Sequence, residues 1–96
     1  MKIVGFIWLE RVVEKIQVKH NVSPEEVEEV LLNKIHRAKI MKMKKGHFRG
    51  EDVYRALGQT EAGRYLAVFF IHKLSDEALI LSARNMDRKE RRSYAR

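Results

Sequence analysis

The C-terminal stretch of the chain carries the densest set of side chains able to act on a phosphodiester. Arg84 ends an apolar run, and Asp87, Glu90 and Tyr94 follow it at a spacing that puts them on one helix face. Another face carries arginines at helical spacing, namely Arg88, Arg91 and Arg92. Guanidinium groups bind phosphate oxygens, and a neighbouring carboxylate or phenol can transfer protons. This pattern predicts phosphate binding and proton transfer on RNA. The alternatives are a solvated helix anchored by Met86 and Tyr94, and an ion pair of Arg84 with Asp87 or Glu90.

A second basic set lies between residues 34 and 49, which include seven lysines and arginines and no acid. We expect this set to contact RNA backbone phosphates, and its members are Lys42, Lys44, Lys45, His47 and Arg49. A solvated charged face is the alternative. The four histidines (His20, His36, His47 and His72) are too scattered in sequence for metal ligands. No metal and no cofactor is therefore predicted.

Composition limits the class of protein. The chain has 96 residues, enough for one domain over residues 1–96, and it is 45% hydrophobic and 34% charged. Its 20 lysines and arginines against 13 acids give a net charge of +7, which favours a polyanionic partner, with nucleic acid ahead of an acidic protein or an anionic membrane. The chain has no cysteine, and the apolar start at residues 1–9 is too short for a membrane span. A cytoplasmic protein without membrane attachment is expected.

The hydrophobic pattern predicts an α+β domain. Strands are expected at residues 3–8, 35–44, 53–59, 64–72 and 78–84, and helices at 9–20, from Ser23 onwards, and after residue 85. Ser23, Pro24 and Glu26 form an N-terminal capping signal for the second helix. The continuous apolar run at residues 66–71 indicates a central strand. Two helices should cover one face of an antiparallel meander of about four strands, leaving the other face for a substrate or partner.

Three groups of residues, in order along the chain, resemble a known family. They are Trp8 with residues 19–23 (KHNVS), residues 50–52 (GED) with 57–60 (LGQT) and Gly63-Arg64, and Ser82-Ala83-Arg84 with Glu90, Arg91 and Tyr94. The family is the BrnT toxins, which belong to the wider RelE-like ribonuclease group. The resemblance implies a RelE-like fold and a type II toxin that cleaves RNA without a metal through the ribose 2′-hydroxyl. It also implies RNA and a co-expressed, BrnA-like antitoxin as partners, with a homodimer inside the toxin–antitoxin complex.

The resemblance also implies site residues. By position they are Arg64, Arg84, Glu90 and Tyr94. We expect guanidinium groups from the sheet and the closing helix to converge on a pocket sized for a phosphodiester. Many relatives have an arginine where this chain has Val53, and Arg55, two residues on, is expected to take its place. Two further departures are Leu9 in place of an acid and Ile16 in place of an asparagine. The alternative reading is a non-catalytic domain of the same fold that binds nucleic acid or an antitoxin. For two of these residues a purely structural role is an equally open alternative to function. Arg55 would then be a residue at the rim of a strand, and Arg64 a residue that only decorates a turn.

Overall fold

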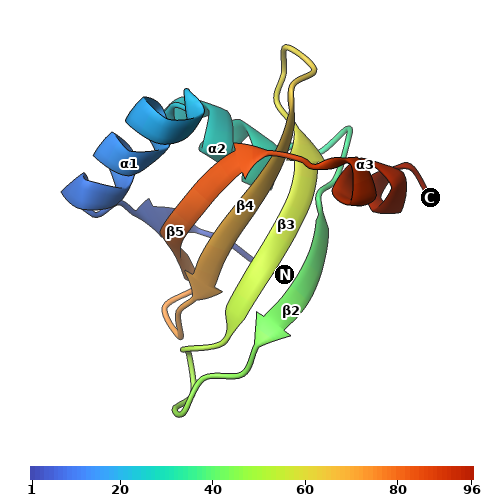
Figure 1. The fold of residues 1–96 in the computed structure, drawn as a ribbon. Helices are drawn as coiled ribbons and strands as arrows, with labels where there is room; N and C mark the ends of the chain where they lie inside the picture. The colour runs from blue at the N-terminus through green and yellow to red at the C-terminus, as the bar shows by residue number, and fades with distance from the viewer.

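The chain folds into three helices and a five-stranded mixed sheet, seen in a computed structural model that describes residues 1–96 (Figure 1). The elements in chain order are β1 (Gly5–Ile7), α1 (Glu10–His20), α2 (Pro24–Leu32), β2 (Lys39–Lys44), β3 (Val53–Gln59), β4 (Tyr65–His72), β5 (Glu77–Asn85) and α3 (Arg88–Ala95). The strand order is β1-β5-β4-β3-β2, in which β2 to β5 form an antiparallel meander and β1 pairs in parallel with β5. The predicted α+β class is confirmed.

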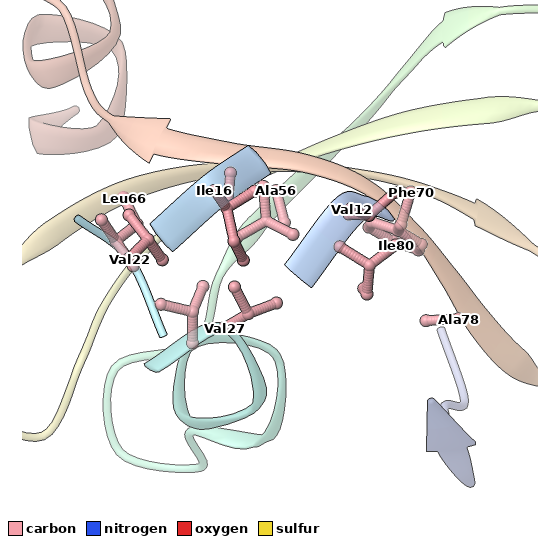
Figure 2. Packing of buried hydrophobic residues seen from close by; sticks show 12 residues of the cluster. Val12, Ile16, Val22, Val27, Ala56, Leu66, Phe70, Ala78 and Ile80 are labelled. Carbon is pink, nitrogen blue, oxygen red and sulfur yellow. The ribbon is translucent and has the colours of Figure 1, made fainter. Parts of the chain in front are cut away.

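The main core lies between α1, α2 and one face of the sheet. Val12 and Ile16 of α1 stand one turn apart and are buried, as are Val27 and Val30 of α2. All four belong to one cluster with residues of the sheet, and Figure 2 shows Val12, Ile16 and Val27 on the same side of the sheet as Ala56, Leu66, Phe70 and Ile80. This packing fixes the sheet against the helices, so that its opposite face is available for other contacts.

The start of α2 has the predicted capping box. The hydroxyl of Ser23 accepts a hydrogen bond from the backbone nitrogen of Glu26 at 3.2 Å, and the Ser23 nitrogen donates to the Glu26 carboxylate at 3.0 Å. Pro24 is the first helical residue, where its missing N–H costs nothing. The capping signal therefore sets the helix start at the expected residue.

The predicted central strand is also confirmed, because β4 pairs with β3 on one side and β5 on the other. The expected strand at residues 35–44 begins later, at Lys39. The side-chain oxygen of Asn33 accepts hydrogen bonds from the backbone nitrogens of Ile35, at 3.0 Å, and His36, at 2.9 Å. Because both backbone N–H groups are bound in this local turn, they cannot donate to a neighbouring strand. Ile35 and His36 are therefore not part of β2.

Strand β2 forms the edge of the sheet, and all six of its residues are exposed. The sequence leaves Met41 and Met43 open as core or interface residues, and the structure excludes the core, because 53% of Met41 and 47% of Met43 is exposed on this edge strand. They remain candidates for an interface. None of the three helices has the length and apolarity needed to cross a bilayer.

Helix α3 lies against the sheet face that α1 and α2 leave uncovered, which we call the open face (Figure 1). Met86 precedes α3 and packs with Leu57 and Ala67 in a small second core. Ala67 is the register partner of both Leu57 on β3 and Arg84 on β5. Because side chains alternate along strands, Arg84 points to the open face with them. The end of β5 and the start of α3 therefore meet there.

Candidate functional site

Arg84 and Glu90 form a bidentate ion pair on the open face. Nη1 of Arg84 lies 2.6 Å from Oε1 of Glu90, and Nη2 lies 3.0 Å from Oε2. The Glu90 side chain is only 5% exposed, whereas that of Arg84 is 34% exposed. Two parallel hydrogen bonds fix the plane of the guanidinium group. The exposed part of that plane is accessible to a ligand.

The start of α3 fixes Glu90 in turn. Asp87 is the N-cap residue, and its carboxylate accepts from the Glu90 backbone nitrogen at 2.8 Å. The Asp87 nitrogen donates to Oε1 of Glu90 at 2.9 Å, which completes a capping box. The spacing Asp87-x-x-Glu90 is visible in the sequence but is not among the predictions above. Glu90 therefore has two roles, as a helix cap and as the partner of Arg84.

Arg55 on β3 joins the same carboxylate. Its Nη1 lies 3.5 Å from Oε2 of Glu90, and its side chain is 18% exposed. Nε of Arg55 is buried and has no hydrogen-bond partner. An unsatisfied buried donor is costly and rare in folded proteins. The Arg84–Glu90–Arg55 cluster therefore combines one excess positive charge with a buried donor that no group of the chain satisfies.

The electrostatics of the cluster keep Glu90 ionised. Burial raises the pKa of Glu90, but the hydrogen bonds from Arg84 and from the Asp87 backbone outweigh it and hold the pKa below its ordinary value. The hydrogen bonds to Glu90 raise the pKa of Arg84, against the opposing effect of burial. The carboxylate is thus a charged acceptor whose two oxygens already receive hydrogen bonds.

Aromatic rings from β4 lie under two arginines. The guanidinium carbon of Arg84 is 5.2 Å from the ring centre of Phe69, and that of Arg91 is 3.8 Å from the ring centre of Tyr65. Neither ring was predicted for the site. A register argument would have found Phe69, since it shares the open face with Ala67, but the pairing of β4 with β5 is not evident from sequence alone.

Tyr94 lies one helical turn after Glu90 on α3. Its ring meets that of Tyr65 edge-on, with ring centres 6.0 Å apart, and its hydroxyl donates to the side chain of Gln59 at 3.4 Å. Burial raises the pKa of the Tyr94 phenol, and the neighbouring Tyr65 adds to the effect. Tyr94 is therefore a neutral phenol at physiological pH, half-buried beside the cluster.

Arg64 does not converge with the other predicted residues, and this part of the expectation is corrected. It lies on the helix-covered side, where its Nη1 is 2.6 Å from the Asn21 carbonyl and 3.1 Å from Glu26 Oε1, and its Nη2 is 3.0 Å from the His20 carbonyl. Its Nε donates to the side chain of Asn85 at 2.9 Å. Arg64 thus joins the end of α1, the start of α2 and the end of β5.

The predicted basic surface is divided. Lys42 forms an ion pair with Asp52 at 3.0 Å, and Asp52 also accepts from the backbone nitrogen of Gly46 at 2.8 Å. The Gly46 hydrogen bond, followed by Lys42, holds the pKa of Asp52 below its ordinary value. Lys42 is therefore paired with an acid that lies outside residues 34–49. The other predicted cations are exposed, namely Lys44, Lys45, His47 and Arg49 near the β2–β3 loop and Arg88, Arg91 and Arg92 on α3.

Lys44, Lys45 and His47 border a hollow with Val53 and Ile71 at the end of the sheet distant from α3. The predicted cations therefore lie in two groups, at opposite ends of β3. Only the α3 group adjoins the Arg84–Glu90–Arg55 cluster. Of the five residues predicted for catalysis, the structure brings together Arg55, Arg84 and Glu90, with Tyr94 alongside.

Comparison with known proteins identifies the family. No curated protein matches the chain. The family model described as the ribonuclease toxin BrnT of type II toxin–antitoxin systems matches residues 8–90, which include the cluster and the start of α3. Because this match covers most of the sequence, the chain belongs to the BrnT family of ribonuclease toxins of type II toxin–antitoxin systems.

Proposed function

We propose that the chain is a toxin that cleaves RNA without a metal ion, at the Arg84–Glu90–Arg55 cluster. The observation that carries the proposal is the bidentate pair of Arg84 and Glu90, with Arg55 and its unsatisfied Nε beside it. A phosphodiester placed there would receive hydrogen bonds from two guanidinium groups. Such groups stabilise charge that develops on a phosphorane. The family supports RNA as the source of the phosphodiester.

The cluster suggests a role for each residue. Arg84 and Arg55 bind the scissile phosphate, and Glu90 orients both of them in the free protein. When the phosphate competes for Arg84, Glu90 loses a hydrogen bond that lowers its pKa and becomes a better proton acceptor. The ribose 2′-oxygen then attacks phosphorus and its proton passes to Glu90. The bond to the 5′-oxygen breaks.

Tyr94 is suited to the opposite proton transfer. A phenol is protonated at neutral pH, so Tyr94 can donate a proton to the leaving 5′-oxygen, although burial raises its pKa and makes it a weaker acid. The products are a 2′,3′-cyclic phosphate and a free 5′-hydroxyl. Arg64 contributes from a distance, because it holds Asn85, whose carbonyl accepts a hydrogen bond from Arg84 at 3.2 Å. We therefore assign Arg64 to positioning.

The partners follow from family and charge. The family description names a type II toxin–antitoxin system, which supports a cognate antitoxin. The proposal that this antitoxin is BrnA-like comes from the sequence resemblance. The net charge of +7 and the exposed arginines of α3 favour a segment with acidic side chains over the open face. The same surface would attract RNA, so antitoxin and RNA should compete for it.

A second candidate function is RNA or antitoxin binding without cleavage. It is favoured by one observation: both Glu90 oxygens and both Nη groups of Arg84 are already occupied. Incubation of the protein with RNA in EDTA separates the two. Fragments ending in 2′,3′-cyclic phosphate support the nuclease, whereas salt-sensitive RNA binding with intact RNA supports the binding domain.

A further inference from the structure

We propose that a pocket beside the cluster holds a nucleobase of the bound RNA, next to the scissile phosphate; this inference rests on the proposed function. The pocket has a volume of about 560 Å³ and lies between α3 and the start of β4. We call it the Tyr65 pocket, and its lining includes Tyr65, Met86, Tyr94, Arg88, Arg91 and Arg92. Its volume is in the range of small-ligand sites.

The pocket already contains a stack of the kind that binds bases. The guanidinium of Arg91 lies 3.8 Å from the ring centre of Tyr65, and its side chain makes no hydrogen bond or ion pair within the chain. Arg91 lies over the Tyr65 ring and is exposed, so part of its guanidinium group remains accessible to a ligand. Unpaired RNA bases stack on guanidinium planes and on aromatic rings. A base would therefore add to an existing cation–π contact between Arg91 and Tyr65.

The position of the pocket relates it to the cluster. Tyr65 lies two residues before Ala67 on β4, and Ala67 is the register partner of Arg84. Two residues along a strand span about 7 Å. On the other side, Arg91 directly follows Glu90 in α3. A nucleotide in the pocket would thus adjoin the phosphate held by Arg84.

The charge of the pocket fits a nucleotide better than a neutral ligand. Three of its seven lining residues are arginines, and none is an acid. Arg88 and Arg92 stand on either side of Arg91 on α3 and can neutralise the phosphates that flank a stacked base. Stacking tolerates any base, so the pocket should give affinity with only a modest sequence preference.

Binding of uncleavable RNA tests this inference. The probes are short 2′-fluoro RNA oligonucleotides, which lack the attacking hydroxyl, with the base removed at one position at a time. Fluorescence anisotropy gives the dissociation constant for the native chain. We expect removal of the base at one position to raise the dissociation constant about tenfold.

Three variants assign that penalty to the pocket. Arg91→Lys keeps the charge and removes the planar group, so the penalty should shrink below about twofold. Tyr65→Phe keeps the ring and should preserve the penalty. Arg11→Lys is the matched control, because it makes the same change at an exposed arginine of α1 outside the pocket, and it should also preserve the penalty. Circular dichroism confirms that each variant is folded.

The outcomes separate this inference from the proposed function. A penalty that is absent at every position, or equally large in Arg91→Lys, overturns the Tyr65 pocket as a base site. If native protein leaves ordinary RNA intact while the Arg91-dependent penalty persists, the nuclease proposal fails and the base site stands. If RNA is cut but no penalty is found, only the base site fails.

Discussion

Glu90 accepts hydrogen bonds from both terminal nitrogens of Arg84, at 2.6 and 3.0 Å, while it also caps the helix to which it belongs. The pair joins the last strand of the sheet to α3. The same carboxylate contacts Arg55 from β3. One buried acid therefore fixes the start of a helix and the orientation of two phosphate-binding side chains. Stability and activity are linked through this residue.

Replacement of Glu90 by glutamine should destabilise the protein. Glu90→Gln keeps the size of the side chain but removes the charge that Arg84 and Arg55 share, and it weakens the α3 capping box. We expect the free energy of unfolding to fall by about 1–3 kcal/mol, measured by urea denaturation. The exposed Glu14→Gln on α1 is the control and should change stability little. Equal effects of the two substitutions would contradict the described role of Glu90.

The stability difference between the native chain and Glu90→Gln should depend on pH. The folded-state pKa of Glu90 lies below its ordinary value of 4.5, so its contribution is fully present above that value and is lost as pH falls through the folded-state pKa. Urea denaturation between pH 7 and pH 3 should show a constant difference down to about pH 5 and a narrowing one below it. Glu26 and Asp52 also have lowered pKa values, but both residues are present in both proteins. Their contributions to the pH dependence of stability therefore cancel in the difference. A difference that grows in acid is incompatible with this assignment.

Arg64 should affect stability more than chemistry. Arg64→Ala removes hydrogen bonds to two backbone carbonyls, to Glu26 and to Asn85, and should lower the free energy of unfolding by about 1–3 kcal/mol. The exposed Arg92→Ala is the stability control. RNA cleavage by Arg64→Ala, assayed where the variant is fully folded, should stay within about tenfold of native. A folded Arg64→Ala chain without any activity would return Arg64 to the catalytic group.

Tyr94 should affect turnover without affecting stability. Tyr94→Phe keeps the ring that packs on Tyr65 and removes only a hydroxyl whose hydrogen bond to Gln59 is long, at 3.4 Å. If the phenol protonates the leaving oxygen, kcat for RNA cleavage should fall by about 10²–10⁴ with KM nearly unchanged. Gln59→Leu removes the same hydrogen bond and serves as the control. Native turnover by Tyr94→Phe would remove Tyr94 from the mechanism.

Local signals in the sequence account for most of the fold. The capping residues before α2 and the apolar run of β4 each determine one element through short-range chemistry, and both were predicted correctly. The start of β2 was missed because it depends on one side chain, Asn33, which binds two backbone N–H groups. The imperfect strand pattern of residues 35–44 does not reveal this competition for the backbone N–H groups.

The site was predictable only in part. Arg84 and Glu90 are only six residues apart in the sequence. An ion pair between them could therefore be considered from the sequence, as the alternative to a functional role for Arg84. The contacts of Arg64 with the end of α1 join residues more than forty positions apart in the sequence. The spacing of hydrophobic residues along the chain does not indicate such contacts. Arg55 reaches Glu90 through strand register and the path of the chain into α3. Tertiary geometry therefore decided which arginines converge.

The central claim is that Arg84, held by Glu90, stabilises the transition state of RNA cleavage. Its most direct test is the rate of cleavage of an RNA oligonucleotide in EDTA by the native chain and by Arg84→Ala, with folding of both confirmed. Native protein should release fragments with 2′,3′-cyclic phosphate ends, and Arg84→Ala should be slower by about 10²–10³. Intact RNA with the native chain, or equal rates for the two proteins, would contradict the claim.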